Sequence, residues 1–286
     1  MRTAYPTDLS DAEWSYLEPY LPAPKTLGRP KIHHTRKVLD AIFYILKSGC
    51  AWRLLPRDFP PWKTVHHYFR TCWCINGTWE KLHTALRERL RARRIGRNTE
   101  PSAGIVDSQS VKTTGVGGER GYDSGKKVKG RKRHLFVDTQ GLVLKAKVQP
   151  ANVMDRDGIK LLLKRVREHF RRLSHLWLDA GYNGKGKGKD WAEKALGLTA
   201  EVVRRPRRPR YVWVKEGEEI DWERIRKLLP EPGFKVLPRR WVVERTFSWI
   251  DQNRRMSKDY ERLPESSEAF IYLAMTRLMV RRLARS

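Results

Sequence analysis

The sequence predicts an α/β protein in which a small all-α domain precedes a mixed sheet flanked by helices. Two observations carry this prediction. Helical apolar spacing dominates residues 8–95, whereas residues 104–204 alternate short apolar runs with helical segments. Between the two patterns, an arginine-rich stretch over 87–97 leads to a turn-rich linker that ends at Pro101. We therefore place the two domains at residues 1–97 and 98–286.

The composition indicates a nucleic-acid partner. The chain of 286 residues carries 60 Lys and Arg against 32 Asp and Glu, a formal net charge of +28. A field of this sign attracts polyanions, and basic side chains displace the counterions condensed on DNA. The alternative is a ribosomal or merely soluble basic protein, which would have no use for acidic residues placed at strand ends.

The cysteines and the first residues predict a cytoplasmic protein that associates with the nucleoid. Cys50, Cys72 and Cys74 cannot all pair, and nothing else resembles a secreted disulfide framework. Residues 1–14 hold no apolar stretch that could serve as a signal peptide. The longest apolar run, 38–46, is too short to cross a bilayer, so no membrane role is expected.

The first domain is predicted to begin with two helices. Ser10 and Glu13 have the spacing of a capping box, which marks a helix start. Residues 34–48 carry apolar side chains at helical spacing and stop at Gly49, a residue suited to the end of a helix.

A basic and aromatic segment follows these helices. Prolines 56, 60 and 61 interrupt the chain before a predicted helix over 62–73. A helix, a turn and a basic helix indicate a helix-turn-helix, whose second helix reads the major groove. We therefore predict DNA contacts for Lys63, His66 and Arg70. The alternative is that these helices only pack together or dimerise.

The second domain contains strands and helices in a mixed order, with Thr139-Gln140-Gly141 as a tight turn. The predicted strands are 104–107, 133–138, 142–148, 175–179 and 200–204. The predicted helices are 154–170, 190–196, 238–257 and 265–284. Residues 184–189 and 204–210 are basic segments that are poor in packing residues.

Three acidic residues stand at strand ends or inside a helix of this domain. Asp107 and Asp179 each end an apolar run, and Glu244 lies in the predicted helix 238–257. Phosphodiester chemistry needs charge neutralisation and an aligned nucleophile, which two Mg²⁺ ions roughly 4 Å apart supply on carboxylate ligands. We predict that Asp107 bridges both ions, with Asp179 on one and Glu244 on the other, and that Mn²⁺ substitutes.

These acids also have a plainer interpretation as polar strand ends and, for Glu244, as a surface residue paired with Arg240. Three further acids compete for the role: Asp138, Asp155 and Asp157. Of these, Asp138 also ends a strand. Capping of the following helix is the favoured role of Asp155.

Five blocks, in order along nearly the whole chain, resemble the DDE transposases of bacterial insertion sequences, of the insertion sequence five type. The blocks are LSDAEW at 9–14, SGCAWRLLP at 48–56, VDSQSVK at 106–112, LDAGY at 178–182 and RRWVVERTFSW at 239–249. The resemblance implies an RNase H-like catalytic domain with the acids Asp107, Asp179 and Glu244. It also implies that the N-terminal helical domain helps to bind the terminal inverted repeats of the element.

Related transposases carry a Tyr, Arg, Glu, Lys signature around the glutamate. Arg240 and Glu244 match it here, while Leu237 and Asp251 occupy the Tyr and Lys positions. The resemblance therefore does not extend to the DNA hairpin intermediate known among proteins that bear the whole signature.

Basic residues around the acids are predicted to hold DNA phosphates. Lys112 and Lys132, the latter within the basic run 126–133, lie close in sequence to Asp107. A solvated loop is the alternative for that run. Arg240, Arg255 and Lys258 fall near one face of the predicted helix 238–257 and its extension, so they too are predicted to reach phosphates.

The predicted function is a DNA transposase that binds the ends of its element, cuts there with metal-activated water, and uses the exposed 3′ hydroxyl to attack target DNA. Its partners are then double-stranded DNA, as terminal repeats and as target, and a second copy of the chain, because two ends must be joined. Two alternatives remain open: an RNase H-like nuclease without strand transfer, and a transposase-derived DNA-binding regulator.

Overall fold

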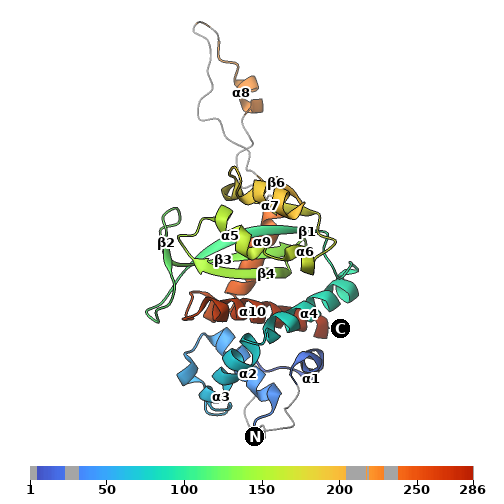
Figure 1. Cartoon of the computed structure of the whole chain (residues 1–286), viewed down its shortest axis with the longest axis vertical. Coiled ribbons are helices and arrows are strands. Elements are labelled where there is room, and N and C mark those ends of the chain that lie inside the picture. Colours follow the sequence, from blue (N-terminus) through green and yellow to red (C-terminus); the bar gives the residue numbers. More distant parts are fainter. Residues whose placement is uncertain (1–4, 23–31, 204–216, 218, 229–237, 286) are drawn as a thin grey trace.

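The computed structural model describes residues 5–22, 32–203, 217, 219–228 and 238–285. The described chain forms a helical N-terminal part and a sheet, with a long C-terminal helix between them (Figure 1). The predicted basic segment 204–210 and Leu237 lie outside the described residues. Of the helices in the described ranges, none combines the length and the apolar character needed to cross a membrane.

The N-terminal part begins as the sequence predicts. The Ser10 hydroxyl accepts from the amide of Glu13 at 3.1 Å, and the Glu13 carboxylate accepts from the amide of Ser10 at 3.0 Å, which confirms the capping box. The second predicted helix ends at Gly49 in a left-handed conformation with φ of 71°. The helical elements are α1 (Asp11–Leu17), η1 (Glu18–Tyr20), α2 (Thr35–Ser48), η2 (Trp52–Leu54), α3 (Trp62–His67), η3 (Tyr68–Cys74) and α4 (Thr78–Ile95).

The predicted helix 62–73 is not regular throughout. It starts as α3 and continues as η3, a π-helical segment. Residues spaced by four lie near one face of a helix. Val65, Phe69 and Trp73 have this spacing and are all buried, so the segment still presents one apolar face to the core.

The sheet is mixed, and helices cover both of its faces, as the sequence predicts. Its order is β2-β3-β1-β5-β6, with β4 paired to β3. The pairs among β1 to β4 are antiparallel, whereas β5 and β6 continue the sheet in parallel with β1. The strands are β1 (Ala103–Lys112), β2 (Gly121–Asp123), β3 (Val128–Asp138), β4 (Val143–Pro150), β5 (His175–Leu178) and β6 (Thr199–Val202).

Two strands are longer than predicted. β1 runs on to Lys112, so the prediction that Asp107 ends a strand is wrong. β3 already starts at Val128 and pairs with β1 from Gly130 onward, so most of the basic run 126–133 is strand and not a solvated loop. Backbone carbonyls and carboxylates accept hydrogen bonds from the basic side chains of this strand, which is why the charges can be buried.

Two long predicted helices are interrupted. The predicted helix 154–170 is divided into α5 (Asp155–Leu162) and α6 (Val166–His169), because Arg165 adopts a left-handed conformation with φ of 60°. The predicted helix 238–257 ends as α9 (Pro238–Asp251), and a short turn, η5 (Arg254–Met256), follows. The prediction that Arg255 and Lys258 continue a helical face of α9 is therefore wrong.

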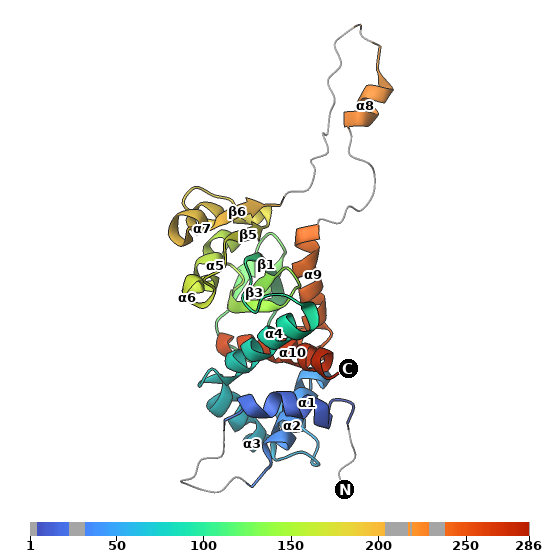
Figure 2. The same ribbon diagram turned by 90° about the vertical axis from the view of Figure 1, so that its right-hand side faces the viewer.

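The C-terminal helix α10 (Pro264–Ala284) matches the prediction for 265–284 and is buried on most of its surface. It packs against α1, α2, α4 and β4, so it joins the helical part to the sheet. In Figure 2, α5, α6 and α7 (Gly188–Leu196) lie on one side of the sheet and α9 on the other. The remaining described helical elements are η4 (Ala180–Tyr182) and α8 (Trp222–Leu228). The boundary at residues 97 and 98, just after α4, stays a prediction.

Candidate active site

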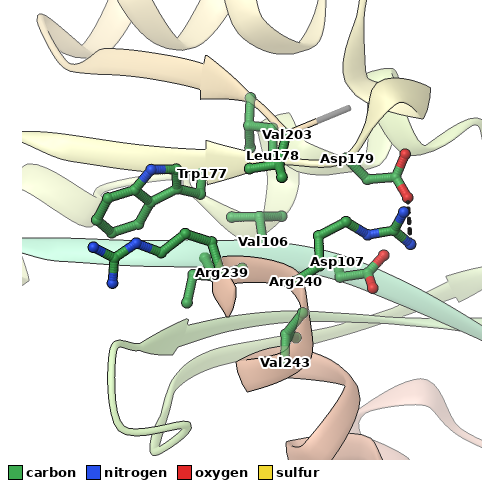
Figure 3. A pocket seen from close by; sticks show the side chains of 10 residues that line it. Val106, Asp107, Trp177, Leu178, Asp179, Val203, Arg239, Arg240 and Val243 are labelled. Carbon is green, nitrogen blue, oxygen red and sulfur yellow. Dashed lines mark ion pairs between the residues drawn. The ribbon is translucent and has the colours of Figure 1, made fainter. Parts of the chain in front are cut away.

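Asp107 on β1 (Ala103–Lys112) and Asp179, directly after β5 (His175–Leu178), lie side by side. β1 and β5 are parallel, and Val106 pairs with Leu178, so the two aspartates occupy the next position on each chain. Figure 3 shows both carboxylates at one end of a narrow pocket. The chain turns immediately after β5, where the Asp179 carboxylate accepts from the amide of Gly181 at 2.9 Å. The strand pairing therefore sets the position of both acids.

Helix α9 brings Glu244 to these aspartates by way of Arg240. The Arg240 guanidinium lies 3.0 Å from an oxygen of Asp179 and 3.5 Å from an oxygen of Glu244. The sequence-based pairing of Arg240 with Glu244 is confirmed, but the same guanidinium also reaches Asp179, which directly follows β5. Arg240 thus joins two of the predicted acids, Asp179 and Glu244, while its charge also acts on Asp107.

The turn between β3 and β4 anchors α9. The Thr246 hydroxyl donates to the carbonyl of Gly141 at 2.8 Å, and Arg245 donates to the carbonyl of Gln140 at 3.0 Å. Thr246 is fully buried, and Gly141 has φ of 82°, a conformation that favours glycine. These two contacts fix α9, and hence Glu244, relative to the sheet.

The environment of Asp107 disfavours its negative charge. Burial raises the pKa of Asp107 to about 6, and the nearby Asp179 charge acts in the same direction. The amide of Ser108, which donates to Asp107 at 2.7 Å, and the Arg240 charge offset part of this pKa shift. A cation bound at this position would relieve the repulsion, so the site is built to accept positive charge.

A buried network supports the strand beside Asp107. The Ser108 hydroxyl donates to Asp155 at 2.7 Å, and the Lys132 ammonium lies 3.1 Å from the same carboxylate oxygen of Asp155. Lys132 also lies 3.6 Å from Asp123. No side-chain hydrogen bond caps α5, so the favoured capping role of Asp155 is wrong. The sequence did not predict this role of Asp155, because its partners Ser108 and Lys132 are distant from it along the chain.

The other two competitor acids have structural partners. Asp138 is fully buried, forms an ion pair with Arg91 and accepts from the amide of Leu142 at 2.8 Å. It therefore stabilises the turn between β3 and β4. Asp157 lies 3.1 Å from Lys187. Neither lines the pocket shown in Figure 3.

The residues predicted to bind DNA fall into three groups. Lys63, Lys112 and Lys258 are exposed. Lys132 and Arg255 are each only 6% exposed and are held by protein carboxylates. His66 and Arg70 are half-buried and line a separate cavity, while Arg240 lies at the acids. DNA contact by each of these side chains stays a prediction.

The residues at the site suit a hard divalent cation only after a rearrangement. Within the described part of the chain, no group of three or more His, Cys, Asp or Glu side chains is gathered closely enough to hold a metal ion. The Arg240 guanidinium occupies the position between Asp179 and Glu244. Carboxylate oxygens are donors of the kind that Mg²⁺ and Mn²⁺ prefer, so the chemistry of the three acids fits such an ion, whereas their present positions do not gather them around one.

Comparisons with known proteins agree along most of the chain. Residues 98–279 match a family described as "Transposase DDE domain", and residues 9–83 match one described as "Putative transposase of IS4/5 family". A Burkholderia cepacia protein named "Insertion element IS402 uncharacterized 16.2 kDa protein" is 33% identical over 119 residues, which are 40% of this chain and 78% of that protein. No solved structure matches the chain.

Proposed function

Because the chain belongs to the DDE transposase family, a family of DNA-cleaving enzymes, we propose that it binds the terminal inverted repeats of an insertion sequence, cuts DNA at those ends and joins them to target DNA. The observation that supports this most directly is the pairing of β1 with β5, which sets Asp107 beside Asp179 while Arg240 connects Asp179 to Glu244. We assign these three acids as catalytic.

The same carboxylates would hold the divalent ions, with Asp107 shared by two Mg²⁺ ions, Asp179 on one and Glu244 on the other. The chemistry supplied at this position is neutralisation of phosphoryl oxygens and activation of water. Mn²⁺ has similar ligand preferences and would substitute. The raised pKa of Asp107 fits a carboxyl group that needs a nearby cation to stay ionised.

Basic residues at the acids and on the exposed surface would bind and position DNA. Arg240 would leave Asp179 and Glu244 when the site is loaded, and its guanidinium would then pair with a phosphate. The exposed lysines, Lys63, Lys112 and Lys258, would bind backbone phosphates and set the register of the DNA.

The active complex would contain at least two copies of the chain, because two ends must be cut and joined together. Acting on chromosomal DNA, it would work at the nucleoid. The high positive charge supports binding whose affinity falls steeply with salt.

The test is a cleavage and strand-transfer assay with the DNA that flanks the gene, in Mg²⁺ and in Mn²⁺. Asp107→Asn, Asp179→Asn and Glu244→Gln should each lower cleavage by at least roughly a thousandfold while DNA binding is retained. Asp11→Asn, an exposed acid on α1, is the matched control. Cleavage without joined products would identify a nuclease, and binding without cleavage by the unaltered protein would identify a regulator.

A further inference from the structure

A second cavity lies between the helical N-terminal part and the segment that joins α9 to α10. Its volume is about 780 Å³. Sites for small ligands span roughly 300–1,000 Å³, so the size suits one nucleotide. Its lining includes Trp52, His66, Arg70, Tyr260, Arg262 and Leu263. The block at 48–56, which the proposed chemistry does not use, forms one of its walls.

The charges around the cavity favour an anionic ligand. Arg70, Arg255 and Arg262 line it, with Glu261 as the acidic residue. Glu261 is committed to Arg255, from which it accepts at 2.9 and 2.5 Å. The charges of Arg255 and Glu261 cancel each other. Arg70 and Arg262 therefore leave a net positive charge at the cavity.

The cavity also offers flat rings. Trp52 and Tyr260 are half-buried, and the Arg255 guanidinium lies 5.9 and 5.4 Å from their ring centroids. His66 meets Trp52 edge-on at 4.9 Å, and burial followed by the charge of Arg70 lowers the pKa of His66. The imidazole is then neutral near physiological pH. Aromatic rings beside basic groups are the surfaces on which proteins stack unpaired bases.

Hydrogen bonds connect this cavity to β1, the strand that carries Asp107, and to its neighbour β3. The amide of Asp259 donates to the carbonyl of Lys112, at the end of β1, at 2.8 Å. Arg131 on β3 donates to the carbonyls of Glu261 and Arg262, each at 2.7 Å. Along β1, Lys112 lies roughly 17 Å from Asp107 at the usual rise per residue. The cavity wall is thus held in a set position relative to the catalytic strand.

We propose that this cavity binds a single unpaired nucleotide of the bound DNA, with its base against Trp52 and Tyr260 and its phosphate against Arg70 and Arg262. The inference rests on the proposed function, since it takes DNA as the ligand. A base inside a duplex is stacked on both faces and cannot enter, so the cavity selects DNA that is opened or distorted near the cut.

The test compares two DNA probes with the full-length protein in EDTA. One duplex carries a single unpaired 5-iododeoxyuridine, and the other has the same sequence fully paired. Wild-type protein should prefer the first probe on the order of tenfold, as expected for stacking of one base. Tyr260→Leu and Arg262→Gln should each remove most of this preference while affinity for the paired duplex is kept, which also shows that they fold. Photocrosslinking followed by mass spectrometry should place the adduct on Trp52 or Tyr260.

Arg93→Gln, which removes an exposed arginine of α4, is the matched control and should keep the preference. A preference that survives both cavity variants, or an adduct outside the cavity, overturns the proposal. If wild-type protein cuts its terminal repeats but prefers neither probe, the cavity proposal fails alone. If it binds neither probe and cuts nothing, the proposed function fails with it.

Discussion

The guanidinium of Arg240 lies 3.0 Å from the carboxylate of Asp179, a residue on the other side of the candidate active site. The same group reaches Glu244 at 3.5 Å. Arg240 therefore balances the charge of two acids in the position where a divalent cation would lie. The metal loading proposed above requires that this positive charge move, and the first prediction follows from the proposed competition.

Replacing Arg240 with glutamine should strengthen metal binding by the DNA-free protein. The variant lacks the positive charge that competes with the ion, so Mn²⁺ affinity should rise by about tenfold, corresponding to about 1.4 kcal/mol. Calorimetric titration measures the change. Arg239→Gln is the control, because the Arg239 guanidinium lies over the Trp177 ring at 4.3 Å. Equal Mn²⁺ affinity in wild type and Arg240→Gln would refute competition between the Arg240 guanidinium and the ion, whether or not the cleavage rate changes.

Replacing Asp107 with asparagine should stabilise the metal-free protein above neutral pH. The pKa of Asp107 is raised from 3.8 to about 6 in the folded state, so the folded protein holds a proton that the unfolded chain has released. Stability from this group is present below the unfolded pKa and is lost as pH rises through about 6. Asp107→Asn should gain about 1–3 kcal/mol at about pH 8 and little at about pH 4.

Urea unfolding in EDTA across this pH range measures the effect, and Asp11→Asn controls for the loss of one surface charge. A gain for Asp107→Asn that does not change with pH would contradict the burial of this carboxyl group.

Replacing Asp155 with alanine should destabilise the fold and impair cleavage. The change leaves the buried Lys132 without its nearest carboxylate and removes the acceptor of the Ser108 hydroxyl. We expect a loss of about 2–4 kcal/mol in the free energy of unfolding. Asp157→Ala, on the same turn of α5, breaks a half-exposed pair with Lys187 and should cost less than about 1 kcal/mol. Similar losses from the two variants would argue against the supporting network.

Replacing Thr246 with valine should loosen the attachment of α9. The buried hydroxyl donates to the carbonyl of Gly141, and its loss should cost about 1–2 kcal/mol. Thr246→Ser keeps the donor and should recover most of the cleavage activity that valine removes. Exposed Ser248→Ala, in the same helix, should change stability by less than about 0.5 kcal/mol. Unfolding measures the stability lost with this hydrogen bond, and cleavage measures the displacement of Glu244 that should follow.

Features that depend on near neighbours in sequence were predictable. The capping box of Ser10 and Glu13, the helix end at Gly49 and the tight turn at Gly141 each follow from side chains within a few residues. The strand before Asp179 and the C-terminal helix followed from apolar spacing over a single element. Such patterns are local, so a sequence displays them directly.

Burial of charge was the main source of error. Arg131 and Lys132 were not predicted to lie in a strand, and a solvated loop stayed open as an alternative for their run, because charged side chains are seldom buried without partners. The partners of Arg131, Lys132 and Arg133 come from residues 119, 153–155 and 256–262, which no local pattern connects to β3. The same reason explains the misassignment of Asp155, whose acceptor role depends on β1 and β3.

The sequence alone determined that Asp179 follows a strand and that Glu244 lies within a helix, and it determined the excess of positive charge that indicates DNA. The first property follows from the order of residues along the chain, and the second from its composition. Only the tertiary structure decided that Arg240 lies between Asp179 and Glu244, and that Trp52 and Tyr260 line one cavity. Those positions depend on strand pairing and helix packing between distant segments, where many contacts together select one arrangement.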